Sequence, residues 1–525
     1  MSTARTACRS GRAHGCVVRC WMLVLVLNPV TGNPATARAG NRLELFRSQH
    51  AQLRNDHLAA LNKIKSFCVE GKLAEGIQAV DAAIRSASGT AATDTRLPET
   101  VTPELSPDLP APERQWQSQL GIHRRRHAQA LFLLSRRVLK AGHTSFAYNL
   151  VRQTAACDPD SRTARRLLGF VRYGNRWVTP FASQQLRRRL VWHETFGWLP
   201  ATHVERYEKG QRYFKRRWVP VDREAELRRD FRNAWEVRTD HYLVRTNRSL
   251  EEGVALARSL ETFYRFLHSS FAGFFSTPEQ IEKLFDGTSS VTGGRSRTLA
   301  RPHVVHFYHD REEYRRTLRP RISQIDITNG LYMQSDRIVY FFHDKPPDRD
   351  FPRATLFHEA THQLLYESQS KQRPIARDAN FWIVEGIACY MESFLPSQTG
   401  FRIGDPRYVR FHWARHRVLE EKYYLPLKTF ASMGLRRFQT DPNIARNYSQ
   451  ASGLTHFLLH YDNGRYRDAL IQHLSQIYTP NQRISIASLE ILTGVNTTEL
   501  DRQYHRYLAD QKSGLSPPRN RTPRQ

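Results

Sequence analysis

The sequence predicts an α+β protein: an N-terminal helical region, then short tryptophan-containing strand-helix modules, then a larger domain. Two observations support this fold class. Apolar residues recur at helical spacing over much of residues 43–168, and the alternation typical of strands begins near residue 235. We expect the larger domain to combine a small sheet with a mostly helical C-terminal lobe. At 525 residues, the chain can bury a large core and form several domains.

Residues 1–39 predict a secretory signal peptide. Four arginines and no acidic residue precede an apolar stretch of about eleven residues, which is too short to span a membrane. Small residues favour cleavage after Ala37 or Ala39. A short membrane-anchored N-terminus is the alternative. No other segment approaches eighteen apolar residues, so we expect no further membrane span and a secreted, periplasmic or cell-envelope location.

The charge balance is strongly basic, with a formal net charge of +29. Removal of residues 1–39 takes away five arginines and no acid, which leaves +24. The arginines are spread over the whole length, and the sequence contains no paired-cysteine finger, RNP-type strand or basic zipper. We therefore expect no specific nucleic-acid partner, and an anionic surface remains a possible partner. Cys68, Cys157 and Cys389 are too few and too far apart for a disulfide framework.

Two helical segments are expected before residue 170. Residues 40–88 predict two helices separated at Gly71. Residues 89–114 are rich in proline and threonine, which predicts a flexible linker. Residues 115–168 predict helical hairpins that resemble tetratricopeptide repeats; an ordinary helical bundle explains them equally well.

Residues 169–232 contain a short repeated pattern. Trp177, Trp198 and Trp218 each lie shortly before a proline and a helical stretch. Each unit therefore predicts a short strand with a buried tryptophan, a proline stop and an amphipathic helix. Regularly spaced aromatic residues more often pack in a core than bind a ligand, so we interpret these units as packing modules.

Residues 233–512 form the predicted larger domain. Two strands come first, followed by a long amphipathic helix that Ser249 is placed to cap. A third strand is expected at 304–310, and residues 329–344 predict two more strands that join near Gln334. The last residues, 513–525, predict a disordered basic tail.

The stretch FHEATHQLLYE, residues 357–367, carries the strongest chemical signal. On a helix, His358 and His362 lie one turn apart on one face and can reach one tetrahedral metal. Glu359 is rotated by only about 100° from His358, so it borders the same site and can accept a proton from a metal-activated water. A chance match of the short HExxH pattern is the competing interpretation.

A third ligand strengthens the metal hypothesis. The metzincin continuation is absent, because position 365 is leucine and position 368 is serine. Further along the chain, NFWIVEGIACYMES places Glu385 inside a strongly apolar helix. Burying a glutamate there is costly unless it binds a metal or another partner.

These two segments together closely resemble the gluzincins, or peptidase MA-like metallopeptidases, whose active-site helices carry HExxH and an E-G-x-A segment. The resemblance implies that His358, His362 and Glu385 hold Zn²⁺ and that Glu359 is the general base. About residues 160–510 also look like an uncharacterised domain-of-unknown-function family of secreted bacterial HExxH proteins that is common in planctomycetes.

The resemblance also implies a substrate-binding edge strand and an oxyanion stabiliser. DRIVYFFHD, residues 336–344, occupies the place of that edge strand. Tyr448 is the candidate oxyanion stabiliser, with His456 two turns further on, although a core or capping role explains Tyr448 equally well. The chain departs from the thermolysin-like pattern at Cys389, where a carboxylate is expected. Glu392 either replaces that carboxylate in contact with the ligands or is a surface charge. Cys389 as a fourth zinc ligand is a further alternative, and it would close the site.

The sequence therefore predicts a secreted zinc metallopeptidase that hydrolyses peptide bonds in a peptide or protein substrate. Two other classes of protein remain open. One is a non-catalytic binding or scaffold protein with a structural or vestigial zinc site. The other is an envelope protein that binds polyanions through its positive charge and needs no metal.

Overall fold

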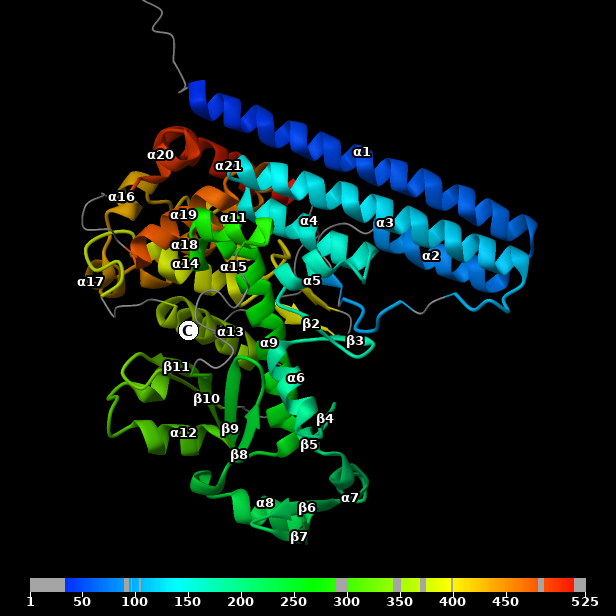
Figure 1. The fold of residues 1–525 in the computed structure, drawn as a ribbon. Helices are drawn as coiled ribbons and strands as arrows, with labels where there is room; N and C mark the ends of the chain where they lie inside the picture. Colours follow the sequence, from blue (N-terminus) through cyan, green and yellow to red (C-terminus); the bar gives the residue numbers. More distant parts are fainter. Residues whose placement is uncertain are drawn as a thin grey trace, which may run out of the picture.

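A computed structural model describes residues 34–88, 94–95, 97–102, 105–288, 301–342, 351–368, 374–397, 400–479 and 486–513. The predicted α+β class is confirmed, with a mostly helical C-terminal region. Figure 1 shows long N-terminal helices at the top, the C-terminal helices beside them, and the main sheet with three small hairpins below. The predicted signal peptide lies outside the described residues up to residue 33, and so does the tail from residue 514.

The N-terminal region is helical, as the apolar spacing predicts. Its helices are α1 (Pro34–Glu70), α2 (Ala74–Ser88), α3 (Ala111–Lys140), α4 (Thr144–Cys157) and α5 (Arg162–Leu167). α1 and α3 run side by side (Figure 1). Leu61, Val80 and Trp116 pack in one buried cluster and so join α1, α2 and α3.

The described residues of the segment predicted as a flexible linker make backbone contacts with other parts of the chain. Strand β1 (Asp94–Thr95) pairs with β14 (Gly400–Arg402) of the C-terminal region. The Val101 amide donates to Asn175 O at 2.8 Å, and the Trp177 amide donates to Glu99 O at 2.7 Å. Composition alone does not indicate these contacts, because an extended chain can satisfy its backbone groups by pairing with the edge of a neighbouring strand.

Three antiparallel hairpins follow, each leading into a helix. The elements are β2 (Val171–Tyr173), β3 (Arg176–Val178), α6 (Pro180–Arg187), β4 (Leu190–His193), β5 (Gly197–Pro200), α7 (Val204–Glu208), β6 (Gln211–Phe214), β7 (Arg217–Pro220) and α8 (Val221–Arg228). Of the three tryptophans predicted to be buried, only Trp177 is fully buried; Trp198 and Trp218 are half-buried. The Trp198 ring packs against Phe181 and Trp192, and Arg206 lies 4.7 Å from the Trp218 ring.

A five-stranded sheet lies at the centre of the larger domain. Its order is β11-β12-β10-β9-β8, in which β9, β10 and β12 are parallel and the two outer strands are antiparallel to their neighbours. The strands are β8 (Trp235–Arg238), β9 (Tyr242–Thr246), β10 (His303–Tyr308), β11 (Gly330–Met333) and β12 (Ile338–Phe342). β11 is therefore one edge of the sheet.

One large core joins the sheet to the helices. It includes Val244 of the sheet, Leu260 of α9, Phe357 of α13 and Trp382 of α14. The helices around it are α9 (Leu250–Ser270), α10 (Ala272–Phe275), α11 (Pro278–Asp286), α12 (Arg311–Leu318), α13 (Phe351–Glu367) and α14 (Phe381–Met391). The predicted cap of α9 is present, because Ser249 Oγ accepts a hydrogen bond from the Glu252 amide at 3.0 Å.

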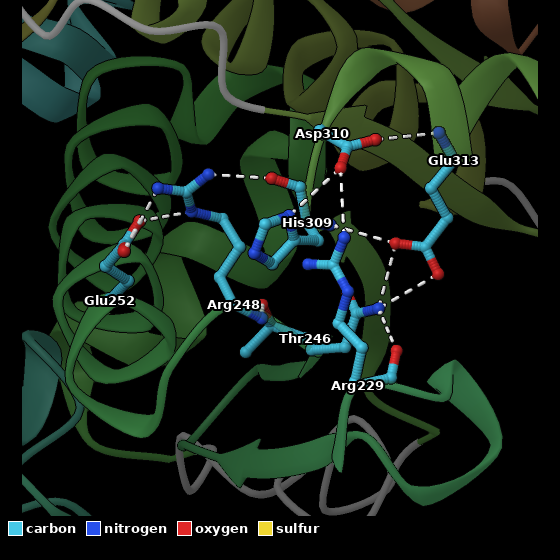
Figure 2. A network of polar contacts seen from close by, with 8 residues as sticks. Arg229, Thr246, Arg248, Glu252, His309, Asp310 and Glu313 are labelled. Carbon is cyan, nitrogen blue, oxygen red and sulfur yellow. Dashed lines mark hydrogen bonds and ion pairs between the residues drawn. The ribbon is translucent and has the colours of Figure 1, made fainter. Parts of the chain in front are cut away.

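A polar network fastens the third hairpin module to the C-terminal ends of β9 and β10 (Figure 2). Arg229 follows α8 and reaches Asp310, the residue that caps α12. The Asn247 side chain donates both to the Arg229 carbonyl and to Glu313. Arg248 pairs with Glu252 and donates to the His309 carbonyl. The charges of these residues satisfy one another, so this network has a structural role.

The C-terminal lobe is mostly helical. Besides β13 (Leu395–Pro396), it contains α15 (Val409–Leu419), α16 (Leu427–Ala431), α17 (Leu435–Gln439), α18 (Ile444–His460), α19 (Arg467–Tyr478), α20 (Leu489–Thr493) and α21 (Thr497–Ser513). Among the described helices, none combines the length and the apolar content that crossing a membrane requires.

Candidate metal centre

Helices α13 and α14 bring the three predicted metal ligands together. His358 Nε2 lies 3.2 Å from His362 Nε2. Glu385 Oε2 is 3.5 Å from His358 Nε2 and 3.7 Å from His362 Nε2. The glutamate is buried and the two histidines are partly buried. Three donor atoms from two separate helices thus form a nearly equilateral triangle.

The triangle has the dimensions of a zinc site. Two ligands about 2.1 Å from a tetrahedral zinc ion lie about 3.4 Å apart. The three separations in the structure, 3.2, 3.5 and 3.7 Å, bracket this value. Two imidazoles and one carboxylate are also a donor set that zinc takes in hydrolases. The residues present therefore fit a single tetrahedral metal with one position left for water or substrate.

His358 is held in place by a carboxylate on its other ring nitrogen. His358 Nδ1 lies 2.9 Å from Glu392 Oε1. Arg410 of α15 donates two hydrogen bonds of 2.8 Å to the same carboxylate, and the Tyr408 hydroxyl lies 3.4 Å from it. With Nδ1 bound to Glu392, the Nε2 lone pair is directed toward the triangle. The contact places Glu392 behind His358, not at the surface.

Two carboxylates of the site favour the ionised form: that of Glu385, which belongs to the triangle, and that of Glu392, which lies behind His358. Burial opposes ionisation of Glu385, but His362 and His358 outweigh it and hold the pKa of Glu385 well below its usual range. Burial also opposes ionisation of Glu392, but the charge of Arg410 and the hydrogen bonds from His358 and Arg410 lower its pKa to about 2. Both carboxylates are therefore ionised near neutral pH.

Glu359 lies between the triangle and the edge of the sheet. Its Oε2 accepts a 2.7 Å hydrogen bond from the Tyr332 amide of β11. The close approach of β11 to α13 depends on Gly330, because a Cβ there would lie 2.9 Å from Thr355 Cγ2. The half-buried carboxylate of Glu359 is thus aimed at a backbone amide of the edge strand, next to His358.

The predicted substrate strand was assigned to the wrong segment. Residues 338–342 form β12, which lies between β11 and β10 and has no free edge. The free edge belongs to β11, which folds back along β12 as the first strand of a hairpin. An open hollow beside β11 is lined by Arg321, Ile322 and residues 331–335. A strand next to the motif helix in sequence need not be the outermost strand in space.

Tyr448 lies near the start of α18, the helix that packs against α14. Its ring packs edge-to-face on Phe438 with centroids 5.4 Å apart, and its hydroxyl accepts a 3.3 Å hydrogen bond from Gln439. Burial and the negative charge of Glu385 raise the pKa of Tyr448 well above its usual range. The Tyr448 hydroxyl is therefore protonated near neutral pH and able to donate a hydrogen bond. His456 makes other contacts. Its Nε2 lies 3.1 Å from the Gly404 carbonyl oxygen, and its Nδ1 lies 2.8 Å from the Tyr507 hydroxyl.

Helix α18 can come this close because of the glycine that follows Glu385. A Cβ at Gly386 would lie 2.7 Å from Ala451 O and closer still to Thr455 Oγ1. The glycine of the E-G-x-A segment thus allows α14 and α18 to touch. It places Tyr448 within reach of the ligand-bearing helix.

Cys389 is buried beside His358. It forms a close group with His358 and Glu392, whereas the group that contains His362 and Glu385 does not include it. Burial raises the pKa of the Cys389 thiol. In this arrangement Cys389 is a neutral neighbour of His358, and the fourth metal position stays free of it.

Three further residues of the site, Arg410, Tyr408 and Tyr332, were not predicted from the sequence. Arg410 and Tyr408 hold Glu392, and Tyr332 supplies the amide that binds Glu359. Among many dispersed arginines, no spacing rule singles out Arg410 as the partner of a glutamate on another helix. A buried glutamate in an apolar helix does, however, imply a cationic partner somewhere in the chain.

Comparison with known proteins gives one partial match. Residues 353–482 are similar to a family described as "Protein of unknown function (DUF1570)". The matched segment contains all three triangle residues together with Glu359, Glu392 and Tyr448, and it excludes the N-terminal helices, the hairpins and the sheet. A search of curated proteins gives no match. The family description names no activity, so the likeness to gluzincins rests on the motifs alone.

Proposed function

We propose that the chain is a zinc-dependent metallopeptidase. The observation that carries the proposal is the triangle formed by His358, His362 and Glu385, with the Glu359 carboxylate between it and a free strand edge. A structural zinc site usually has four protein ligands, whereas three ligands leave a position for the reaction. An edge strand beside that position can pair with an extended peptide backbone.

A bound Zn²⁺ would polarise the scissile carbonyl and lower the pKa of the attacking water. Glu359 would take the proton from that water and pass it to the leaving amine. A substrate strand that pairs with β11 would occupy the Tyr332 amide, which now binds Glu359, and so release the carboxylate for this role. The Tyr448 hydroxyl would donate to the oxygen that gains negative charge.

A non-catalytic scaffold protein is the second candidate, and one observation favours it. The hydrogen bond of 2.7 Å between the Tyr332 amide and Glu359 is also what a purely structural glutamate would make. In that case the metal and Glu359 would together fix α13 against the sheet. The two candidates differ in whether the protein cleaves peptides, and cleavage by the enzyme candidate needs the Glu359 charge.

The test compares the wild type with Glu359→Gln, using the chain from residue 40. Zinc content and cleavage of a peptide library are measured for both, with the exposed Glu279→Gln as the matched control. The proposal predicts one zinc ion at this centre in all three proteins and cleavage only in the wild type and the control. Zinc bound without cleavage in the wild type would favour the scaffold candidate.

We also propose that the protein acts outside the cytoplasm, because residues 1–39 carry the features of a secretory signal. N-terminal sequencing of the protein isolated from its native cells tests this point. A mature N-terminus near residue 38 or 40 supports it, and a chain that still begins at residue 1 in the cytoplasm contradicts it.

A further inference from the structure

A second cluster of metal-binding side chains lies in the N-terminal helices, outside the segment that matches the family. His57 lies in α1, His123 and His127 lie one turn apart in α3, and Cys157 is the last residue of α4. His57 is buried, and the other three are partly buried. Three separate helices thus contribute imidazole and thiol groups to one place.

Three of these residues are close enough to share one ion. The donor atoms of His57, His127 and Cys157 all lie within 4.8 Å of one another. Cys157 Sγ is 4.0 Å from His57 Nε2. In a tetrahedral zinc site, a thiolate sulfur and an imidazole nitrogen lie about 3.6 Å apart. The sulfur and the ring therefore need to move only slightly closer to bind the same ion.

The fourth residue of the cluster holds His57. His57 Nδ1 lies 2.8 Å from His123 Nε2. If His57 Nδ1 donates its proton to His123, then His57 Nε2 carries the lone pair and faces Cys157. A metal-binding histidine normally has such a partner on its other nitrogen, which fixes the tautomer and the ring orientation. The pair therefore has the arrangement of a ligand and its positioning residue.

Two of the three candidate ligands already have the protonation state that metal binding needs. Burial lowers the pKa of His57 to about 3 and that of His127 to about 4, so both rings are neutral and able to coordinate at neutral pH. Burial raises the pKa of Cys157 to about 12, and its thiol lies 3.5 Å from the Arg124 carbonyl. Binding must therefore release the thiol proton. The positive charge of Arg124 near His57 opposes a cation here, and the negative charge of Asp56 near His127 favours one.

One side chain must turn when the ion binds. The rings of His57 and His127 are stacked with centroids 4.0 Å apart and an interplanar angle of 2°. Their in-plane lone pairs cannot converge on one ion in that orientation. A rotation of the half-buried His127 ring brings its nitrogen toward His57 Nε2 and Cys157. The nitrogen and sulfur donors suit Zn²⁺ and not Mg²⁺ or Ca²⁺, which prefer oxygen ligands.

We propose that His57, His127 and Cys157 form a second zinc site that ties α1 to α3 and α4, with His123 as the positioning residue for His57. The fourth position is left to water. The site is independent of the proposed hydrolase function, because it shares no residue with the triangle of α13 and α14.

Cobalt titration of the metal-free full chain tests the proposal, since a thiolate bound to Co²⁺ gives a charge-transfer absorption that imidazole and carboxylate ligands do not. The wild type is expected to bind two Co²⁺ ions and to show this absorption. Cys157→Ser should bind one ion and lack it. Cys68→Ser is the matched control, because Cys68 is a buried cysteine of α1 outside the cluster, and it should behave as the wild type.

Three further variants separate the possible outcomes. His127→Gln, checked for native helicity by circular dichroism, should also lose the absorption. His123→Gln should keep it with a Co²⁺ affinity about tenfold lower, as expected for a positioning residue. The double variant His358→Ala/His362→Ala should lose the other ion and keep the absorption, so the two proposals can fail separately. A wild type that binds Co²⁺ without this absorption, or absorption that survives Cys157→Ser, would overturn the proposal.

Discussion

Replacing Glu392 by glutamine is a sensitive probe of how the metal centre is built. The carboxylate accepts two hydrogen bonds of 2.8 Å from Arg410 and lies 2.9 Å from His358 Nδ1. These contacts lower the pKa of Glu392 from the ordinary 4.5 to about 2. A change of that size corresponds to a preference of about 3 kcal/mol for the ionised form. The side chain is only 7% exposed, so solvent screens the contacts little.

Glu392→Gln keeps an acceptor for His358 Nδ1 but loses the ion pair with Arg410. We expect the zinc affinity of the centre to fall about 10- to 100-fold. The free energy of unfolding at pH 7 should fall by roughly 3 kcal/mol or less, since Arg410 is partly exposed and can regain water. A lowered glutamate pKa stabilises the fold above pH 4.5, and this contribution is lost as the pH falls toward 2. The difference from the wild type should therefore shrink below pH 4.5.

Competition with a chromophoric chelator measures the affinity, and urea unfolding measures the stability. Both measurements are best made in the Cys157→Ser background, so that only the site of α13 and α14 binds metal. Glu226→Gln is the control, because its pair with Arg223 is exposed and worth less than about 1 kcal/mol. Unchanged zinc affinity in Glu392→Gln would refute the positioning role of Glu392.

Three other predictions follow from the packing around the centre. Tyr448→Phe should lower kcat about 10²- to 10³-fold at unchanged zinc content, measured by peptide cleavage and metal analysis; unaltered kcat would leave Tyr448 as a packing residue. Gly386→Ala should lower the free energy of unfolding by about 1–3 kcal/mol in urea, because its Cβ would lie 2.7 Å from Ala451 O; a neutral effect would contradict the close helix contact. Burial lowers the pKa of His456 to about 4, so the neutral ring is stabilising above pH 6.5 and this stability is lost as the pH falls toward 4. Wild type should therefore lose about 3 kcal/mol more than His456→Gln between pH 7 and 4, and equal losses in thermal unfolding would contradict this.

The three candidate metal ligands were predictable because their spacing is a local property of helices. His358 and His362 share a face at one-turn spacing, and Glu385 is conspicuous as a charge within an apolar helix. The N-terminal helices, the cap at Ser249 and the strand pair of residues 329–344 also follow from local patterns.

The contacts that complete the centre depend on tertiary packing and could not be predicted in the same way. Arg410 reaches Glu392 from another helix, and the free edge at β11 depends on the order of strands in the sheet. The second cluster was missed for the same reason. His57 and Cys157 are 100 residues apart, and only the packing of α1, α3 and α4 brings them together.

The central claim, that His358, His362 and Glu385 hold one zinc ion with an open position, is tested most directly by anomalous diffraction at the zinc edge from crystals of the mature protein. We expect one strong peak enclosed by the two Nε2 atoms and the Glu385 carboxylate, with no bond to Cys389. No peak at this place, or an ion bound by Cys389 as a fourth protein ligand, would contradict the claim.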